Sequence, residues 1–257
     1  MSKNDGIRKT LLVAFSLCIV CSVVVSTAAV LLKPAQEANK TLDRKRNILA
    51  AAGMLQEGVS VEDQFAQIQT RVVDLRDGRF TDAVDPASYE PVKAAKDPAR
   101  SMNLSKSEDI AGIGRREDFA LVYLVEAADG EVEKIILPVR GYGLWSTLYG
   151  FIALEADANT VAGLGFYEHG ETPGLGGEVD NPRWKSQWPG KQVYRDGAVD
   201  IALAKGSVDP DSADAPWRVD GLSGATLTAR GVTQLVQFWL GEQGYEPFLT
   251  NLKAGEA

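Results

Sequence analysis

Phe119-Ala-Leu-Val-Tyr-Leu-Val125 and Val132-Glu-Lys-Ile-Ile-Leu-Pro-Val139 are two apolar runs separated by a short polar segment that contains Asp129-Gly130. Both runs are rich in β-branched and other strand-forming residues, and Asp-Gly between two such runs is a strong hairpin signal. Residues 151–156 and 161–167 have the same character farther along the chain. These four runs predict an antiparallel sheet.

An amphipathic helix is predicted near the C-terminus, where apolar residues recur at the spacing of one helical face and Gly241 follows as a typical stop. Its apolar positions are Val232, Leu235, Val236, Trp239 and Leu240. Apolar spacing also predicts helices over residues 41–54 and 61–75. Residues 80–114, which are rich in Asp, Pro, Ser and Ala, are expected to form a long surface excursion. A sheet with helices packed on it defines an α+β domain.

Residues 11–32 form a run of 22 residues without a charge or a proline. About 20 apolar residues are enough to cross a bilayer, so this run predicts one N-terminal transmembrane helix. A cleaved signal peptide is the alternative, with Lys3, Arg8 and Lys9 as its charged region and residues 26–29 as its small-residue site. Signal peptides have apolar cores of only ~7–15 residues, which favours a retained anchor.

Basic residues flank this run on both sides, and more of them follow it than precede it. Those that follow it are Lys33, Lys40, Arg44, Lys45 and Arg46. The positive-inside rule taken alone would keep the remaining chain in the cytoplasm, although long domains translocate largely regardless of flanking charge. Cys18 and Cys21 lie at i and i+3 inside the run, where they either line a metal site shared with other subunits or pack against a neighbouring helix.

Composition narrows the classes of function. At 257 residues, with 45% hydrophobic and 24% charged residues, the chain is typical of one sizeable folded domain with an added segment. Its net charge of -8 argues against nucleic acid as a partner, because binding to a phosphate backbone needs a basic surface. One histidine and two cysteines, both in the apolar run, leave the rest of the chain without ligands for a histidine or thiolate metal site. Redox chemistry in this domain would need an organic cofactor.

Three glycine-bearing segments are candidates for a binding site. They are Gly141-Tyr142-Gly143-Leu144-Trp145-Ser146, Gly170-Glu171-Thr172-Pro173-Gly174-Leu175-Gly176-Gly177 and Asp220-Gly221-Leu222-Ser223-Gly224-Ala225-Thr226-Leu227-Thr228. Glycines let a backbone approach a ligand closely. The third segment directly precedes the predicted C-terminal helix, where free N–H groups and the helix dipole favour an anion such as a phosphate. The alternative for this segment is a capped helix start after a tight turn.

The third segment also carries a resemblance. Asp220-Gly221-Leu222-Ser223-Gly224-Ala225-Thr226 resembles the D-x-x-[ST]-G-A-T flavinylation motif, in which a flavin transferase uses FAD to join the final threonine hydroxyl to the phosphate of FMN. With the other two segments, the single span and the Phe238-Trp239-Leu240-Gly241 ending, the chain resembles the C subunit of the sodium-translocating NADH:quinone reductase over nearly its whole length.

The resemblance implies one covalent FMN, held as a phosphoester on Thr226, with no catalytic residue and no metal in this chain. The matching motif positions are Asp220, Ser223, Gly224 and Ala225. Further cofactor-binding positions that it implies are Leu144, Trp145, Thr172, Leu175 and Gly176. Trp145 either stacks on the flavin or belongs to the core, and Lys205 either approaches the phosphate or is an ordinary surface lysine. His169 and Glu168 lie beside the second segment, but a one-electron carrier needs no acid–base group there, and we expect them to be structural or solvated.

The same resemblance implies an electron carrier within a complex that oxidises NADH, reduces ubiquinone and exports sodium. Its expected partners are the other subunits, including a second flavin-bearing membrane subunit, and the flavin transferase during maturation. The expected location is the cell inner membrane, as a single-pass protein. Residues 1–10 would then be cytoplasmic, 11–32 the transmembrane helix and 33–257 a periplasmic domain with its FMN-binding core at about 115–250. The motif includes no nicotinamide site, so the chain alone is not expected to oxidise NADH.

Two alternatives remain. The flavin subunit of the related ferredoxin:NAD oxidoreductase complex shares the threonine motif and the anchor, and it would be distinguished by the proteins that co-purify. A tethered sensor or binding module without flavin would use the third segment only to begin a helix, and it would be colourless.

Overall fold

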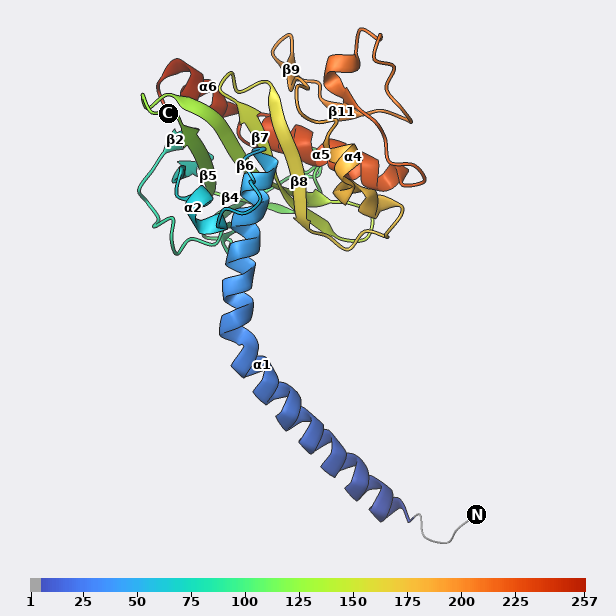
Figure 1. Cartoon of the computed structure of the whole chain (residues 1–257). Helices are drawn as coiled ribbons and strands as arrows, with labels where there is room; N and C mark the ends of the chain where they lie inside the picture. Colours follow the sequence, from blue (N-terminus) through green and yellow to red (C-terminus); the bar gives the residue numbers. More distant parts are fainter. Residues whose placement is uncertain (1–5) are drawn as a thin grey trace. The chain divides into compact units, whose positions relative to one another are not determined.

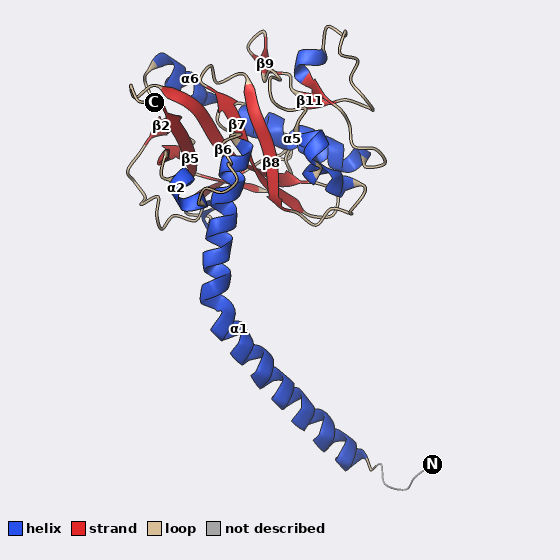
Figure 2. Cartoon of the chain, viewed as in Figure 1, coloured by secondary structure: helices blue, strands red, loops and turns tan. Residues whose placement is uncertain are grey.

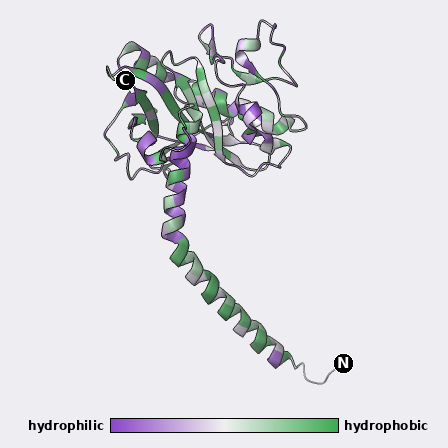
Figure 3. Cartoon of the chain, viewed as in Figure 1, coloured by the Kyte–Doolittle hydropathy of each residue, from purple (hydrophilic) through white to green (hydrophobic). Residues whose placement is uncertain are grey.

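The computed structural model describes residues 6–257, and the chain divides into two compact units, residues 1–43 and 44–257. The first unit consists of most of helix α1 (Ile7–Ala51), which contains the predicted span and, among the described residues, is the one helix long and apolar enough to cross a membrane. Figure 3 shows its apolar stretch in green. Lys3 lies outside the described residues. The helix expected at 41–54 is not separate, because α1 continues past Pro34 to Ala51.

The second unit is built on a six-stranded antiparallel sheet with the strand order β2-β1-β5-β6-β7-β8 (Figures 1 and 2). Its strands are β1 (Ile68–Asp74), β2 (Arg79–Phe80), β5 (Phe119–Glu126), β6 (Val132–Tyr142), β7 (Thr147–Glu155) and β8 (Val161–Glu168). The four predicted runs are β5 to β8, so the antiparallel sheet is confirmed. Gly130 turns the β5–β6 hairpin with φ +86°, a conformation that glycine adopts without strain.

The helix predicted at 61–75 is wrong. Helix α2 (Val61–Phe65) is short, and the chain then enters β1, which pairs with β5 along its whole length. Both faces of the sheet are covered, so Val72 is buried in one hydrophobic cluster and its neighbour Val73 in the other. Adjacent apolar residues in a doubly buried strand lack the alternation of a half-exposed strand, so apolar spacing alone does not distinguish this strand from a helix.

Residues 80–114 are mostly irregular, as expected, but they are not only a surface excursion. They include helix α3 (Pro91–Ala94) and strand β3 (Ser101–Asn103), which pairs with β4 (Arg115–Glu117). Tyr89 and Leu104 are buried and fix the segment to the domain.

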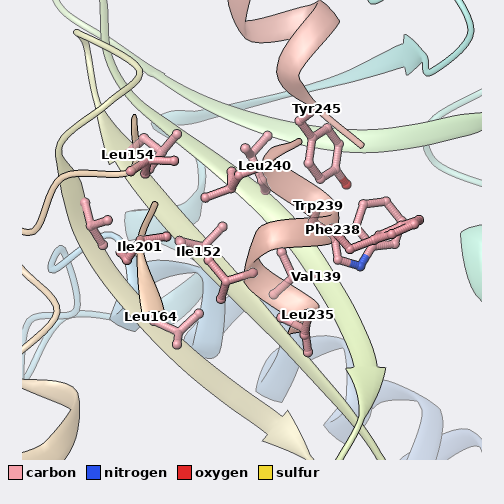
Figure 4. Packing of buried hydrophobic residues seen from close by; sticks show 14 of the residues in the cluster. Val139, Ile152, Leu154, Leu164, Ile201, Leu235, Phe238, Trp239, Leu240 and Tyr245 are labelled. Carbon is pink, nitrogen blue, oxygen red and sulfur yellow. The ribbon is translucent and has the colours of Figure 1, made fainter. Parts of the chain in front are cut away.

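Helices cover both faces of the sheet. The last turns of α1, with Ile48 and Leu49, pack on one face. The predicted amphipathic helix is α5 (Thr226–Leu240), which packs on the other face together with α6 (Glu246–Ala254). Figure 4 shows Leu235, Trp239 and Leu240 of α5 among the strand residues of this core.

The remaining elements are short, and they lie between β8 and α5 in the sequence. They are the 3-10 helices η1 (Gly176–Asp180) and η2 (Ala215–Trp217), helix α4 (Pro182–Lys185) and strands β9 (Tyr194–Arg195), β10 (Ala198–Val199), β11 (Ala202–Leu203) and β12 (Arg218–Val219). β11 and β12 pair in parallel, with Leu203 opposite Val219. This pairing brings the chain after β11 beside the third glycine segment. The α+β fold is therefore confirmed.

Candidate functional site

The three glycine segments meet at the N-terminal end of α5. The first connects β6 to β7, the second follows β8, and the third leads into α5. Glu171 joins them: its Oε1 accepts the N–H groups of Leu144 at 3.0 Å and Trp145 at 2.9 Å, and its Oε2 accepts the Thr228 hydroxyl at 2.6 Å. Ser146 N–H is a further donor to Oε1, at 3.3 Å.

Glu171 is charged although it is only 5% exposed. Burial raises the pKa of its carboxyl, but the hydrogen bonds from Thr228 and the loop amides outweigh burial and lower the pKa below the ordinary value. Because its pKa is lowered in the folded state, Glu171 stabilises the fold at pH values above the ordinary pKa of a glutamate. This stabilisation is lost as the pH falls through the lowered pKa.

Close packing explains two of the glycines around this carboxylate. A Cβ on Gly143 would lie 2.6 Å from Glu171 Oε1, and a Cβ on Gly176 would lie 2.6 Å from Thr228 Oγ1. Any side chain at either position would displace the carboxylate or the hydroxyl.

Helix α5 begins without a side-chain cap. Its N-cap residue is Ala225, and Thr226, the first helical residue, is exposed. Within residues 6–257, the N–H groups of Thr226, Leu227 and Thr228 have no hydrogen-bond acceptor. The capped helix start considered from the sequence is therefore wrong. The first turn instead presents free donors at the positive end of the helix dipole.

A groove of about 680 Å³ lies beside this helix start. Lys205 and Arg230 line it together with Thr226, and neither basic side chain forms an ion pair within the described part of the chain. Of the expected positions, Asp220, Ser223 and Gly224 also line it. Lys205 is exposed, as a surface lysine would be, and its side chain lines this groove.

Asp220 fastens the wall of this groove. Its Oδ1 accepts the N–H of Val208 at 2.7 Å, and its main-chain oxygen accepts Trp184 Nε1–H at 2.9 Å. Next to it, Gly221 N–H donates to the Gly206 oxygen at 2.8 Å. A Cβ on Gly221 would lie 2.3 Å from the Ala204 oxygen. The backbone at Gly221 and the backbone at Ala204 are therefore so close that only glycine fits at position 221.

Asp220→Ala is expected to loosen the segment that carries Lys205, because it removes the carboxylate that holds the Val208 amide. A hydrogen bond to a charged group contributes about 1.5–3 kcal/mol, whereas Asp220→Asn keeps an oxygen acceptor and should cost less. Amide hydrogen exchange at Val208 and denaturant unfolding of both variants measure this. Unchanged protection of Val208 in the alanine variant would contradict it.

Two of the other expected positions are exposed apolar side chains: Trp145 is 66% exposed and Leu175 43%. Leu227, which was not among the expected positions, lies in the first turn of α5 and is 51% exposed. The interpretation of Trp145 as a core residue is therefore wrong. Leu175 reaches the third segment, since its Cδ2 lies 2.9 Å from the place of a Cβ on Gly224. The remaining expected positions differ in burial: Thr172 is exposed, Leu144 is half-buried, and Gly176 and Ala225 are buried.

His169 has a structural place. Its Nδ1 accepts the N–H of Glu171 at 3.2 Å, so its Nε2 carries the proton and donates to Asp180 at 2.8 Å. Its hydrogen bonds hold the second glycine segment, in agreement with the structural role expected for it. Glu168 is exposed.

Sequence reasoning missed four residues of this site: Glu171, Thr228, Arg230 and Gly231. Arg230 follows Thr226 by one helical turn, so the predicted helix could have indicated it. The others depend on tertiary contacts. A Cβ on Gly231 would lie 2.5 Å from the Tyr142 oxygen, a close approach that links α5 to the first glycine segment.

The FMN-binding domain family matches residues 143–241, which include most of the first segment, all of the second and third, and α5. Curated relatives that are named as the C subunit of the Na(+)-translocating NADH-quinone reductase match the whole chain: that of Pseudomonas aeruginosa is 56% identical over 100% of both proteins. That of Yersinia pestis is 48% identical over 98% of this chain and 95% of its own. The chain belongs to the family of C subunits of the Na(+)-translocating NADH-quinone reductase.

Solved structures agree. The crystal structure of NqrC from Shewanella oneidensis is 37% identical, with a TM-score of 0.78 over 84% of this chain and 99% of that one. The crystal structure of the corresponding Na(+)-translocating NADH-quinone reductase protein from Parabacteroides distasonis is 28% identical, with a TM-score of 0.65 over 85% of this chain and 97% of that one. The chain is therefore a subunit of an oxidoreductase complex and contains an FMN-binding domain. Membership of this family confirms the resemblance to the C subunit of the sodium-translocating reductase, rather than to the flavin subunit of the ferredoxin:NAD oxidoreductase complex.

Proposed function

We propose that the chain holds one FMN covalently, as a phosphoester on Thr226, and relays electrons between redox subunits during NADH oxidation, quinone reduction and sodium export. The observation that carries this proposal is the uncapped start of α5. There an exposed threonine hydroxyl and amides without an acceptor lie beside a groove lined by two basic side chains that form no ion pair within residues 6–257. Bound FMN would supply electron transfer. The protein's part is to hold it and set its surroundings.

The groove suits the phosphate end of FMN. Thr226 offers the oxygen to be esterified, and Arg230 lies one turn later on the same helix face. Lys205 faces the groove from the segment after β11. Two basic side chains and the helix dipole favour the anionic phosphodiester, while the groove's acidic side chain, Asp220, is already bonded to Val208.

The apolar surface suits the ring end. Trp145, Leu175 and Leu227 expose large apolar areas that a flat ring would cover. Leu144, Thr172 and Gly176 lie in the same two loops and complete the expected set. Ser223, Gly224 and Ala225 form the turn into α5, and Gly224 has φ +71°, which favours glycine at this motif position.

FAD is the proposed donor of the flavin that becomes attached to Thr226. A flavin transferase would direct the Thr226 oxygen to the FMN phosphorus of FAD; the bond from that phosphorus to the AMP portion breaks, AMP leaves, and the hydroxyl proton is released. The ester keeps the cofactor attached in every redox state. This matters for a carrier whose site is as exposed as Thr226 and Trp145.

The proposed placement is a single-pass protein of the cell inner membrane. Residues 11–32 would span the bilayer, residues 33–257 would form a periplasmic domain, and residues 115–250 would contain the FMN-binding core. The length and composition of α1 support the span. A second flavin-bearing membrane subunit would exchange electrons with this domain.

The test is a peptide map of the denatured full chain, expressed with and without a flavin transferase. We expect the peptide that contains Thr226 to gain the mass of FMN less one water, only with the transferase. The absence of covalent flavin, while the same transferase modifies a positive-control protein, would sink the proposal.

Lys205→Gln/Arg230→Gln is expected to slow flavinylation about tenfold or more. The variant removes two charge-assisted contacts to the phosphate, and about 1.4 kcal/mol corresponds to a factor of ten. Lys106→Gln/Arg183→Gln makes the same change in net charge at exposed residues outside the groove. Time courses of covalent flavin formation compare the two, and equal rates would show that the groove's charges are not used.

A further inference from the structure

We infer that Glu171 is a positioning residue of the flavin site. Its carboxylate holds the first glycine segment, which carries Trp145, against the start of α5. This inference rests on the proposed function. It adds a residue to which no cofactor role is assigned and which need not contact the flavin itself.

Each hydrogen bond that the Glu171 carboxylate accepts comes from a residue of the candidate site. Oε1 accepts from Leu144, Trp145 and Ser146, three consecutive amides of the first glycine segment. Oε2 accepts from Thr228, two residues after the proposed attachment point. The side chain therefore fixes the exposed Trp145 and the first turn of α5 relative to each other.

Two glycines make room for this carboxylate. A Cβ on Gly143 would lie 2.6 Å from Oε1, and a Cβ on Gly176 would lie 2.7 Å from Oε2. Thr228 is fully buried, so its hydroxyl has no access to water as an alternative acceptor. Removing the carboxylate would leave the buried Thr228 hydroxyl of α5 and the three amides of the first glycine segment without this acceptor, and both places carry expected flavin contacts.

Substitutions at Glu171 and Thr228 remove different parts of this hydrogen-bond network. Glu171→Gln keeps the shape and an oxygen for the three amides, but it replaces the acceptor of the Thr228 hydroxyl with an amide donor and removes the charge. Thr228→Val keeps Glu171 and its three amide bonds and removes only the hydroxyl. Thr228→Ser restores the hydroxyl.

The first measurement is amide hydrogen exchange of the full chain without flavin. We expect the amides of Leu144, Trp145 and Ser146 to be protected in the unmodified protein and to exchange about fivefold faster or more in Glu171→Gln, because hydrogen bonds to charged groups are stronger than those to neutral ones. Thr228→Val should keep this protection. The readout needs no flavin, so it remains valid even if the wild-type chain forms no covalent flavin and the proposed function fails.

The second measurement uses the flavinylated chain. We expect Glu171→Gln to shift the flavin absorption spectrum and to make the midpoint potential more positive, because a fixed negative charge nearby opposes the gain of an electron. Thr228→Val should shift the spectrum in part, and Thr228→Ser should restore it. If Glu171→Gln does not fold, the Thr228 pair carries the test.

Asp74→Asn is the matched control. Asp74 is a buried carboxylate that also accepts backbone and side-chain donors, but from Arg76 and outside the three segments. Both substitutions should lower the unfolding midpoint, and only the change at Glu171 should alter the flavin. A wild-type spectrum and potential in Glu171→Gln, or unchanged exchange of the three amides, would overturn the inference.

Discussion

Thr226→Val is expected to abolish covalent flavin entirely while leaving the fold intact. Valine keeps the β-branched shape, and the Thr226 hydroxyl makes no hydrogen bond within residues 6–257, so its loss leaves no partner unpaired. The substitution removes the atom that would be esterified and nothing else that the structure uses. In-gel flavin fluorescence and the mass of the peptide containing residue 226 measure the effect after expression with a flavin transferase.

Two comparisons sharpen this result. Thr250→Val removes an exposed threonine hydroxyl from α6 and should leave flavinylation unchanged. Thr226→Ser keeps a hydroxyl and should retain measurable covalent flavin. Flavin attached at the wild-type level in Thr226→Val would show that another residue is the acceptor.

Gly231→Ala is expected to have the second-largest effect, because it forces α5 away from β6. The added Cβ would lie 2.5 Å from the Tyr142 oxygen and 3.0 Å from Gly143 Cα, and both contacts are with backbone that has no rotamer to change. Overpacking of this kind costs about 1–3 kcal/mol. It also displaces the helix start that presents Thr226, so we expect a lower denaturation midpoint together with slower flavinylation.

Gly165→Ala is the control for this substitution. Gly165 lies in β8, and a Cβ there would meet no atom within 4 Å. Alanine reduces the conformational freedom of the unfolded chain, so this variant should be as stable as the wild type or slightly more stable. Equal stability and flavinylation of Gly231→Ala and Gly165→Ala would show that α5 tolerates a shift from β6.

The parts of the fold that could be predicted from the sequence are those with a local signal. Strands β5 and β6 are indicated by composition and by Asp129-Gly130, and α5 by its spacing and Gly241. Strand β1 carries no such signal, since Val72 and Val73 are both buried and its partner β5 begins far along the chain. The side of the sheet on which each residue lies depends on that pairing, which one sequence does not contain.

The same limit applies to the site. The motif around Thr226 is local, and it indicated the proposed attachment point, the turn and the helix that follows. The bond between Glu171 and Thr228 joins residues 57 positions apart, and nothing near either residue indicates it. Asp220 belongs to the same motif, and nothing local indicates that its carboxylate accepts the amide of Val208.

Hydrogen bonds within the protein hold parts of all three glycine segments. Glu171 binds the amide of Trp145, His169 binds the amide of Glu171, and Asp220 binds the amide of Val208. The entropy lost in ordering these loops is therefore lost when the domain folds, and little remains to be lost when a ligand arrives. A flavin transferase would meet one rigid acceptor surface, so modification should report on folding: a chain that has not folded correctly would stay unlabelled.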